Sequence, residues 1–291
     1  MAKELVLITG ANGHIGFRVV VFALQLGYKV RAAVRSQEKA DRILAAQSIV
    51  ALDPGEDLTF CFVPDLLQLG AYNEAVKDVH SIIHIASPIT SGITEDKYET
   101  HFIQPAVSGT LGIIRAAQTS PTVQRVVITS SIVALVPWYD FFEAETGRAF
   151  NEQSRTGDPS GPYKNEFEAY ASSKVQAFNS TMKLLAEAKP DFDVVHVHPS
   201  FVVGKDELVT KAEDVTMGTN GAALRQVLGV KQGWTTPSTS VHLDDVALAH
   251  VKALSPAIPS GYSLIAQSEG TNGTTWGDAI EIVQRHFPEQ W

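Results

Sequence analysis

Short apolar segments alternate along the chain with longer segments in which apolar residues recur every three or four positions. The short segments are bounded by glycine, proline or polar residues and predict strands, whereas the longer segments predict amphipathic helices. Strands are expected at residues 5–8, 28–34, 58–63, 81–85, 125–129, 194–198 and 263–266, and helices at residues 17–24, 37–47, 71–79, 102–119, 163–188, 222–228, 244–253 and 276–286. Strands that alternate with helices form a parallel sheet covered on both faces, so the pattern predicts an α/β fold.

A glycine-rich turn joins the first expected strand to the first expected helix. It reads Thr9-Gly10-Ala11-Asn12-Gly13-His14-Ile15-Gly16. A helix N-terminus presents unpaired N–H groups and a partial positive charge, and glycines let a pyrophosphate approach where a Cβ would block it. Glycine also serves ordinary tight turns, but the strand before and the helix after this turn indicate a dinucleotide site. We therefore expect a Rossmann-type doubly wound parallel sheet, with cofactor contacts from Gly10, Asn12, Gly13, His14, Ile15 and Gly16.

Two stretches interrupt the alternation of strands and helices. Residues 136–162 hold several aromatic side chains among glycine, proline and acidic residues, and residues 204–237 mix charges with glycine-rich turns. Long insertions after the strands of such a sheet usually build the ligand site. We therefore expect a nucleotide-binding domain at residues 1–198, to which residues 236–266 return. A smaller C-terminal substrate-binding region is expected at residues 199–235 and 267–291.

The composition is that of an ordinary globular protein. Of 291 residues, 44% are hydrophobic, and no apolar run approaches the roughly 18 residues that a membrane helix requires. Acidic residues outnumber basic ones by 32 to 23, which argues against nucleic acid or an anionic membrane as the main partner. No secretion signal is visible before the first expected strand, and the single cysteine, Cys61, cannot form an internal disulfide. The cytoplasm is the expected compartment.

Tyr170 and Lys174 lie four residues apart on the expected helix 163–188, so they share one helix face. An ammonium beside a phenol stabilises the phenolate and draws its pKa toward neutrality, which lets tyrosine exchange a proton with a carbonyl oxygen. The same spacing also occurs on solvated helix faces. A third feature favours chemistry, because Thr129-Ser130-Ser131 ends an expected strand at the sheet edge where active sites lie.

Seven short motifs occur along the chain in a consistent order. They are Thr9-Gly10-x-x-Gly13-x-x-Gly16, Pro64-Asp65-Leu66, His84-Ile85-Ala86-Ser87-Pro88, Thr129-Ser130-Ser131, Tyr170-x-x-x-Lys174, His198-Pro199-Ser200-Phe201-Val202-Val203-Gly204 and Val241-His242-Leu243-Asp244-Asp245-Val246-Ala247. With these motifs the chain resembles, over nearly its full length, the extended short-chain dehydrogenase/reductase family. Within that family it is most similar to fungal carbonyl and methylglyoxal reductases, dihydroflavonol reductases and cinnamoyl-CoA reductases.

The resemblance implies a role for individual residues. Ser131 would orient the substrate oxygen, Tyr170 would be the acid/base, and Lys174 would anchor the nicotinamide ribose and modulate the tyrosine pKa. Further cofactor contacts are implied beside the adenine, near the ribose and phosphates, and beside the nicotinamide, at Asp65, Leu66, Ala86, Ser87, Thr129, Pro199 and Ser200.

The chain also departs from the family pattern in two places. Ser108 stands where relatives usually have an asparagine tied to a water relay. Many relatives continue beyond the position of Trp291, so a more open pocket is expected. Relatives occur as monomers and as homodimers.

Charge at the end of the second expected strand indicates the cofactor. An acidic residue there would bind the ribose hydroxyls of NAD, whereas arginine suits the extra phosphate of NADP. The sequence has Arg35 at the strand end and Lys39 one turn into the next helix. A surface arginine without a ligand is the simpler alternative, but we expect NADP(H).

Two histidines were considered as metal ligands and set aside. His196 and His198 alternate on an expected strand and share one face, but no third ligand stands at metal-binding spacing. We interpret them as core histidines and expect no metal.

The expected activity is therefore NADPH-dependent reduction of an aldehyde or ketone, with Tyr170 protonating the oxygen. The alternatives are a sugar-nucleotide epimerase or dehydratase, a non-redox isomerase or cyclase, and a regulator that senses NADP without turnover. Mostly aliphatic and aromatic residues surround the expected site, which favours a hydrophobic small-molecule carbonyl substrate. The expected substrate contacts are Pro88, Ile132, Val133, Phe201 and Trp234.

Overall fold

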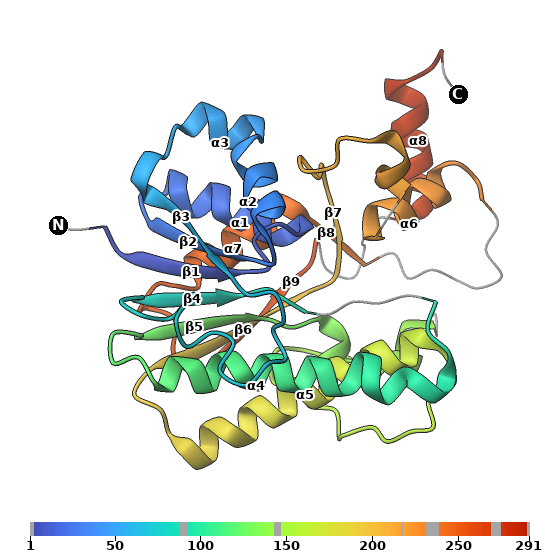
Figure 1. Ribbon diagram of the computed structural model, residues 1–291. Coiled ribbons are helices and arrows are strands. Elements are labelled where there is room, and N and C mark those ends of the chain that lie inside the picture. Colours follow the sequence, from blue (N-terminus) through green and yellow to red (C-terminus); the bar gives the residue numbers. More distant parts are fainter. Residues whose placement is uncertain are drawn as a thin grey trace.

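In the computed structural model of this chain, the described residues are 3–87, 92–142, 147–216, 218–230, 239–268 and 275–289. Within them, seven parallel strands form one sheet in the order β3-β2-β1-β4-β5-β6-β9, and β7 pairs with β8 separately (Figure 1). The strands are β1 Leu5–Thr9, β2 Lys29–Val34, β3 Leu58–Phe62, β4 Ser81–His84, β5 Arg125–Thr129, β6 Asp193–Pro199, β7 Phe201–Val203, β8 Ser240–His242 and β9 Ser263–Ala266. This arrangement confirms the predicted Rossmann-type doubly wound parallel sheet.

The central strands are apolar on both faces because helices cover both. Val6 and Ile8 of β1 belong to one hydrophobic cluster, and Leu7 between them belongs to another. Successive side chains of a strand point to opposite faces, so each cluster lies on one side of the sheet. The two-sided burial explains why the strands read as continuous apolar runs rather than alternating ones.

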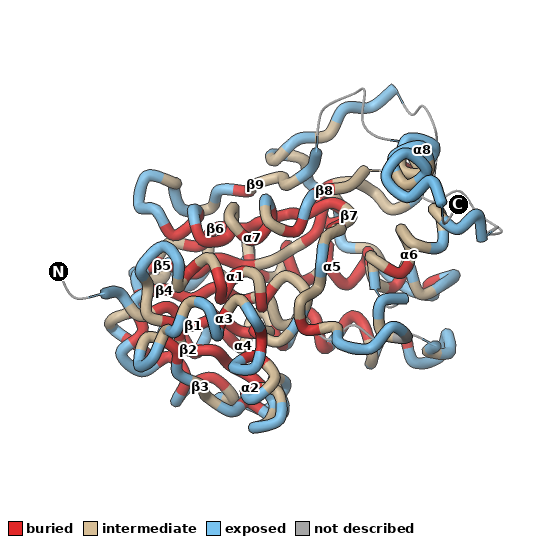
Figure 2. Tube along the Cα trace, turned by 90° about the horizontal axis from the view of Figure 1, so that it is seen from above, coloured by how far each residue is buried: buried red, intermediate tan, exposed pale blue. Residues whose placement is uncertain are grey.

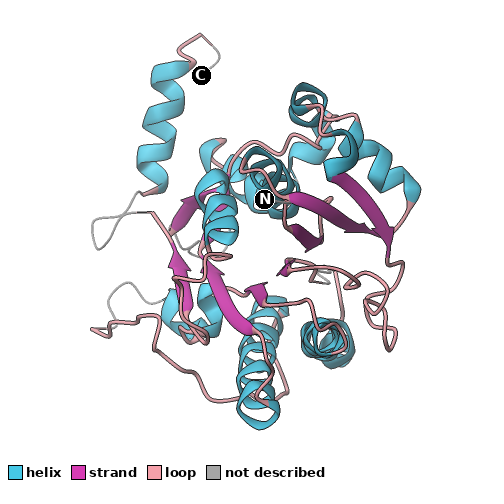
Figure 3. Ribbon diagram, turned by 90° about the vertical axis from the view of Figure 1, so that its left-hand side faces the viewer, coloured by secondary structure: helices cyan, strands magenta, loops and turns pink. Residues whose placement is uncertain are grey.

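Two helical layers complete these clusters (Figures 1 and 3). On one side lie α1 His14–Gln25, α2 Gln37–Leu44, α3 Gln47–Leu52 and α7 Leu243–Lys252, and on the other lie α4 Gln104–Gln118 and α5 Glu166–Ala188. The strand order reverses direction between β1 and β4, because the chain first adds β2 and β3 on one side of β1 and then returns to add β4 on the other. The carboxyl edge between β1 and β4 is therefore a topological switch point, the place where such sheets bind their ligands.

A smaller set of elements lies beyond this edge. It comprises β7, β8, α6 Gly218–Val227 and α8 Trp276–His286. None of the described residues of α8 is buried, and Figure 2 shows this helix at the periphery. Its start is fixed locally by a capping box, in which Thr275 and Asp278 satisfy each other's backbone N–H groups.

Several expected helix bounds differ from the structure. The helix expected at residues 71–79 is wrong: residues 71–78 form consecutive turns, and Gly70 and Asp78 both have positive φ. Its apolar residues are nevertheless buried, which explains the misleading period. The helix expected at residues 37–47 is two helices, because Ala46 is extended and ends the first. A π-helical turn at Glu99–Ile103 precedes α4.

Candidate active site

The glycine turn after β1 packs tightly against its neighbours. Gly10 has φ +68°, and a Cβ there would lie 2.8 Å from the backbone nitrogen of Ala86. A Cβ on Gly16 would lie 2.0 Å from the carbonyl oxygen of Gly10. These two glycines therefore let β4 and α1 approach the turn, and α1 begins at His14 with no acidic residue in its first turn. No side chain of the described residues caps the start of α1, so its first N–H groups are available at the carboxyl edge of the sheet, and such a helix start fits the diphosphate of a dinucleotide.

The end of β4 is tied to this turn by a buried threonine. The hydroxyl oxygen of Thr9 accepts from the backbone nitrogens of Ile85 at 3.1 Å and Ala86 at 3.2 Å, and it lies 2.8 Å from Nδ1 of His84. Ala86 and Ser87 are therefore held beside the glycine turn. The sequence analysis had included Thr9 in the motif but gave its side chain no role.

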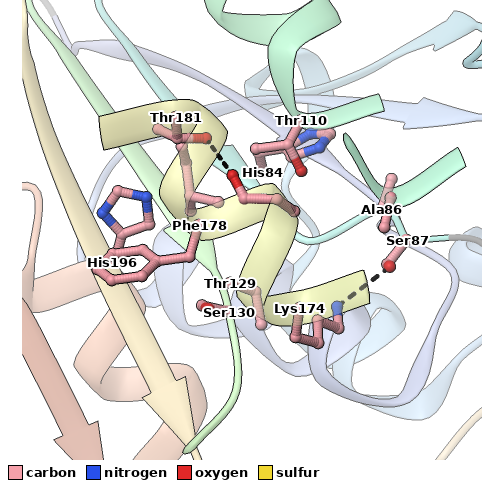
Figure 4. A pocket seen from close by; sticks show the side chains of 13 residues that line it. His84, Ala86, Ser87, Thr110, Thr129, Ser130, Lys174, Phe178, Thr181 and His196 are labelled. Atoms are coloured by element: carbon pink, nitrogen blue, oxygen red, sulfur yellow. Dashed lines mark hydrogen bonds between the residues drawn. The ribbon is translucent and has the colours of Figure 1, made fainter. Parts of the chain in front are cut away.

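Ser131, Tyr170 and Lys174 come together at the carboxyl edge of β5. Ser131 begins the 3-10 turn Ile132–Ala134, and its hydroxyl lies close enough to the Tyr170 phenol to lower the pKa of that group. Lys174 lies one turn further along α5, with Nζ 5.7 Å from the centre of the Tyr170 ring. Nζ also donates to the Ser87 hydroxyl at 3.1 Å (Figure 4). The lysine thus reaches from the tyrosine to the cofactor edge formed by β4.

Burial dominates the electrostatics of this group. It raises the pKa of Tyr170, and the hydrogen bond from Ser131 opposes the rise only in part. It lowers the pKa of Lys174 to about 8. The expectation that Lys174 draws the phenol pKa toward neutrality is not met. The free energy lost when the phenolate is removed from water exceeds the stabilisation that its neighbours give it. Near pH 7 the tyrosine therefore carries its proton.

The other expected cofactor residues line the same edge of the sheet. Arg35 directly follows β2 and is exposed, and Lys39 in α2 lies 3.3 Å from Glu38. Asp65, after β3, accepts from the backbone nitrogen of Leu67 at 2.9 Å, so it shapes its own loop. Leu66 packs toward Gly109 of α4.

Some expected contacts are engaged within the protein. His14 Nε2 lies 3.1 Å from the carbonyl oxygen of Gly204, so its ring faces the segment after β7 rather than the glycine turn. The Thr129 hydroxyl lies 2.7 Å from His250 Nε2 on α7. Ser200, which follows Pro199 at the end of β6, is buried, and its hydroxyl has no partner among the described residues. Asn12 and Ile15 are half-buried in the turn.

The expected substrate contacts fall into three groups. Ile132 and Val133 are buried, at 8% and 5% exposure, and offer little surface to a ligand. Phe201 is half-buried, with its ring edge-to-face with Trp276 of α8 at 6.1 Å. Pro88 and Trp234 lie outside the described residues.

One aromatic neighbour of the site was missed by the sequence analysis. The ring of Phe167 lies 6.4 Å from that of Tyr170 and remains 36% exposed. Its position three residues before Tyr170, on the same helix face, was the available signal.

A small cavity of about 20 Å³ lies behind Lys174, between the sheet and the helices α4 and α5 (Figure 4). A cavity of this size holds a water molecule but is too small for an aldehyde or ketone of ordinary size. Ala106 and Thr110 of α4 line it, and Ser108 does not. The expected departure at Ser108 therefore lies on a different face of α4 from this cavity.

His196 and His198 are core residues that share one face of β6, as expected. Their rings lie 4.9 and 5.1 Å from that of Phe178. Among the described residues, no group of three or more potential ligands could hold a metal ion. In the same part of the chain, no helix is long and apolar enough to cross a membrane.

Comparisons with known proteins agree with this architecture. The family model described as "NAD dependent epimerase/dehydratase family" matches residues 6–261. The chain is 39% identical to ketoreductase CTB6 of Cercospora nicotianae and 36% identical to aldehyde reductase 2 of Sporidiobolus salmonicolor, covering 99% of this chain and 82% of each relative.

The structure of yeast methylglyoxal/isovaleraldehyde reductase Gre2 complexed with NADPH superposes with a TM-score of 0.83 at 27% identity, covering 98% of this chain and 83% of that one. The family match spans the glycine turn, the three-residue group at β5 and α5, and the strands that carry them. The chain belongs to the NAD-dependent epimerase/dehydratase family, within the extended short-chain dehydrogenases/reductases.

Proposed function

We propose that this protein reduces aldehydes or ketones with NADPH, using Ser131, Tyr170 and Lys174. The observation that carries the proposal is their convergence: Lys174 lies one helical turn after Tyr170, with Nζ 5.7 Å from the centre of its ring, and the Ser131 side chain lies close enough to influence the phenol. Lys174 links this group to Ser87, next to the glycine turn that fits a dinucleotide. A bound nicotinamide dinucleotide would supply the hydride.

The residues of this chain would handle the oxygen and the proton. Ser131 donates to the substrate oxygen and orients it, and the Tyr170 hydroxyl donates as negative charge builds on that oxygen. The ammonium of Lys174 stabilises the phenolate that the transfer leaves behind. Lys174 is itself held by Ser87 at 3.1 Å, so its position is linked to the loop after β4.

Preference for NADPH over NADH rests on the end of β2. The residues there are Arg35, Ser36 and Gln37, so no carboxylate occupies the position that would bind the ribose hydroxyls of NAD. Arg35 is exposed, and its guanidinium can bind a phosphate with two parallel hydrogen bonds. Lys39 adds a second positive charge. Its ion pair with Glu38 is exposed and therefore weak, so it does not prevent Lys39 from binding a phosphate.

A hydrophobic substrate is supported by the aromatic side chains near the site. Phe167 presents exposed ring surface beside Tyr170, and Phe201 and Trp276 form a second aromatic pair after β6. Such surfaces favour bulky apolar groups, because each buried methylene contributes about 0.8 kcal/mol.

The proposal is tested by following NADPH oxidation by the purified protein with a panel of carbonyl compounds. We expect kcat/KM to rise from small polar carbonyls to aryl and long-chain ketones and aldehydes, with no reaction or competition from UDP-sugars. Inhibition by a UDP-sugar at low concentration would favour an epimerase instead. Cytoplasmic location and a monomeric or homodimeric state also remain predictions, and cell fractionation and size-exclusion chromatography test them.

A further inference from the structure

His198 bridges three segments that meet beside Ser131. Its imidazole Nδ1 lies 3.1 Å from the backbone carbonyl oxygen of Ser131, and its Nε2 lies 3.1 Å from the hydroxyl oxygen of Ser263 on β9. The side chain is 0% exposed. One buried ring therefore joins the turn after β5 to β6 and to the edge strand β9.

The chemistry of these partners fixes the direction of both hydrogen bonds. A carbonyl oxygen only accepts, so Nδ1 of His198 carries the proton and donates to Ser131. Burial lowers the pKa of His198 to about 4, so the ring is neutral near pH 7 and its Nε2 accepts from the Ser263 hydroxyl. The Ser263 hydroxyl thereby orients the ring that holds the Ser131 carbonyl.

The Ser131 backbone decides where its hydroxyl points. Its carbonyl oxygen also accepts from the backbone nitrogen of Ala134 at 3.0 Å, so two donors fix that peptide plane. By contrast, the Ser131 hydroxyl accepts from the Val133 nitrogen only at 3.4 Å, a weak restraint. The place of the Ser131 Cβ, and with it the range of positions open to the hydroxyl, therefore depends on the backbone more than on the side chain's own contacts.

We propose that His198 is a positioning residue that holds the Ser131 hydroxyl in line with the Tyr170 phenol. The proposal rests on the proposed function, because it assigns His198 a part in that reaction. His198 acts only through Ser131 and does not touch the reacting atoms. Misplacement of an orienting hydroxyl by about 1 Å lowers the rate of the chemical step rather than the affinity for substrate.

His196 offers a matched control on the same strand. It packs against the same Phe178 ring and is equally buried, but neither of its ring nitrogens has a hydrogen-bond partner among the described residues. Packing is common to the two histidines, whereas the bond to Ser131 belongs to His198 alone.

The test compares His198→Leu, His198→Asn and His196→Leu in NADPH-dependent turnover. We expect His198→Leu to lower kcat about tenfold with little change in KM or in NADPH affinity. The Asn side chain places an N–H near the position of Nδ1, so His198→Asn should recover most of that loss. His196→Leu should stay within about twofold of the parent.

A double-mutant cycle then separates positioning from packing. In a Ser131→Ala background, His198→Leu should cause no further loss of kcat, because the hydroxyl that it positions is gone. If His198→Leu does not fold, Ser263→Ala carries the test, and it should lower kcat about threefold at unchanged KM.

Two results would overturn the inference: an equal loss from His196→Leu and His198→Leu, or losses that add in the Ser131→Ala background. An unchanged kcat in folded His198→Leu, or in Ser263→Ala where that variant carries the test, would do the same. These outcomes differ from a failure of the proposed function, in which the parent shows no NADPH-dependent reduction or Ser131→Ala is as active as the parent.

Discussion

At the scale of single residues, burial controls the protonation state of Tyr170 and so its proposed role. Burial raises its pKa, so near pH 7 it carries the proton that the proposed reaction would use. Tyr170→Phe removes that donor and keeps the ring beside Phe167, so kcat should fall by about two to four orders of magnitude. Stopped-flow or steady-state turnover measures the loss, and NADPH titration together with a thermal melt should match the parent. Near-normal turnover would contradict the assigned role.

Arg35 carries the prediction on cofactor choice. Arg35→Ala should weaken NADPH binding by about 1.5–3 kcal/mol, the range for hydrogen bonds to charged groups, and leave NADH binding nearly unchanged. Titration calorimetry with both cofactors measures this. Arg115→Ala, which removes an exposed arginine on α4, is the matched control. Equal affinity of the parent for the two cofactors would refute the interpretation of the strand end.

At the scale of elements, the start of α5 sets the position of the helix face that carries Tyr170 and Lys174. The Asn165 side chain accepts from the backbone nitrogen of Glu168 at 2.9 Å and so caps the helix five residues before Tyr170. Asn165→Ala should lower the free energy of unfolding by about 1 kcal/mol, whereas Asn165→Asp keeps an acceptor and should cost little. Urea denaturation measures both. An equal loss in the two variants would show that the cap is not the cause.

The elements also show how far a sequence alone predicts this site. Strands buried on both faces form apolar runs of strand length, so the seven strands of the sheet, and with them the edge that carries Ser131, were predictable. Tyr170 and Lys174 followed from helical spacing. The turns at residues 71–78 could not be predicted. The buried residues Tyr72 and Val76 have the spacing of a helix, and the sequence does not indicate that Asp78 adopts a positive φ.

At the scale of the whole molecule, the segment after β7 is tied to the helices α2 and α3 by contacts that no local pattern reveals. Glu207 accepts from the backbone nitrogen of Ser48 at 2.7 Å, and Arg42 donates to the carbonyl oxygen of Leu208 at 3.0 Å. The partners are about 160 residues apart in the chain, so nothing in either neighbourhood predicts the other. These bonds link the loop after β7 to α2 and α3.

The whole molecule also contains a set of buried neutral histidines that makes its stability depend on pH. Burial lowers the pKa of His84 and His196 to about 3, and of His198 and His250 to about 4. In the unfolded chain each titrates near pH 6.5, so between pH 6.5 and about 4 the unfolded state binds more protons. The free energy of unfolding should therefore fall as the pH is lowered, by about 1.4 kcal/mol per pH unit for each histidine.

Carboxylates contribute mainly below this window. Hydrogen bonding from Arg18 lowers the pKa of Asp244, and hydrogen bonding from Thr275 lowers that of Asp278, so their loss of stabilisation begins near pH 4. His196→Leu should therefore reduce the slope of the free energy of unfolding against pH between pH 6.5 and 4. The reduction should correspond to about one proton, because the variant loses one buried base without breaking a hydrogen bond. Urea denaturation across this range measures the slope, with His286→Gln on exposed α8 as the control. An unchanged slope in His196→Leu would mean that this histidine is protonated in the folded protein.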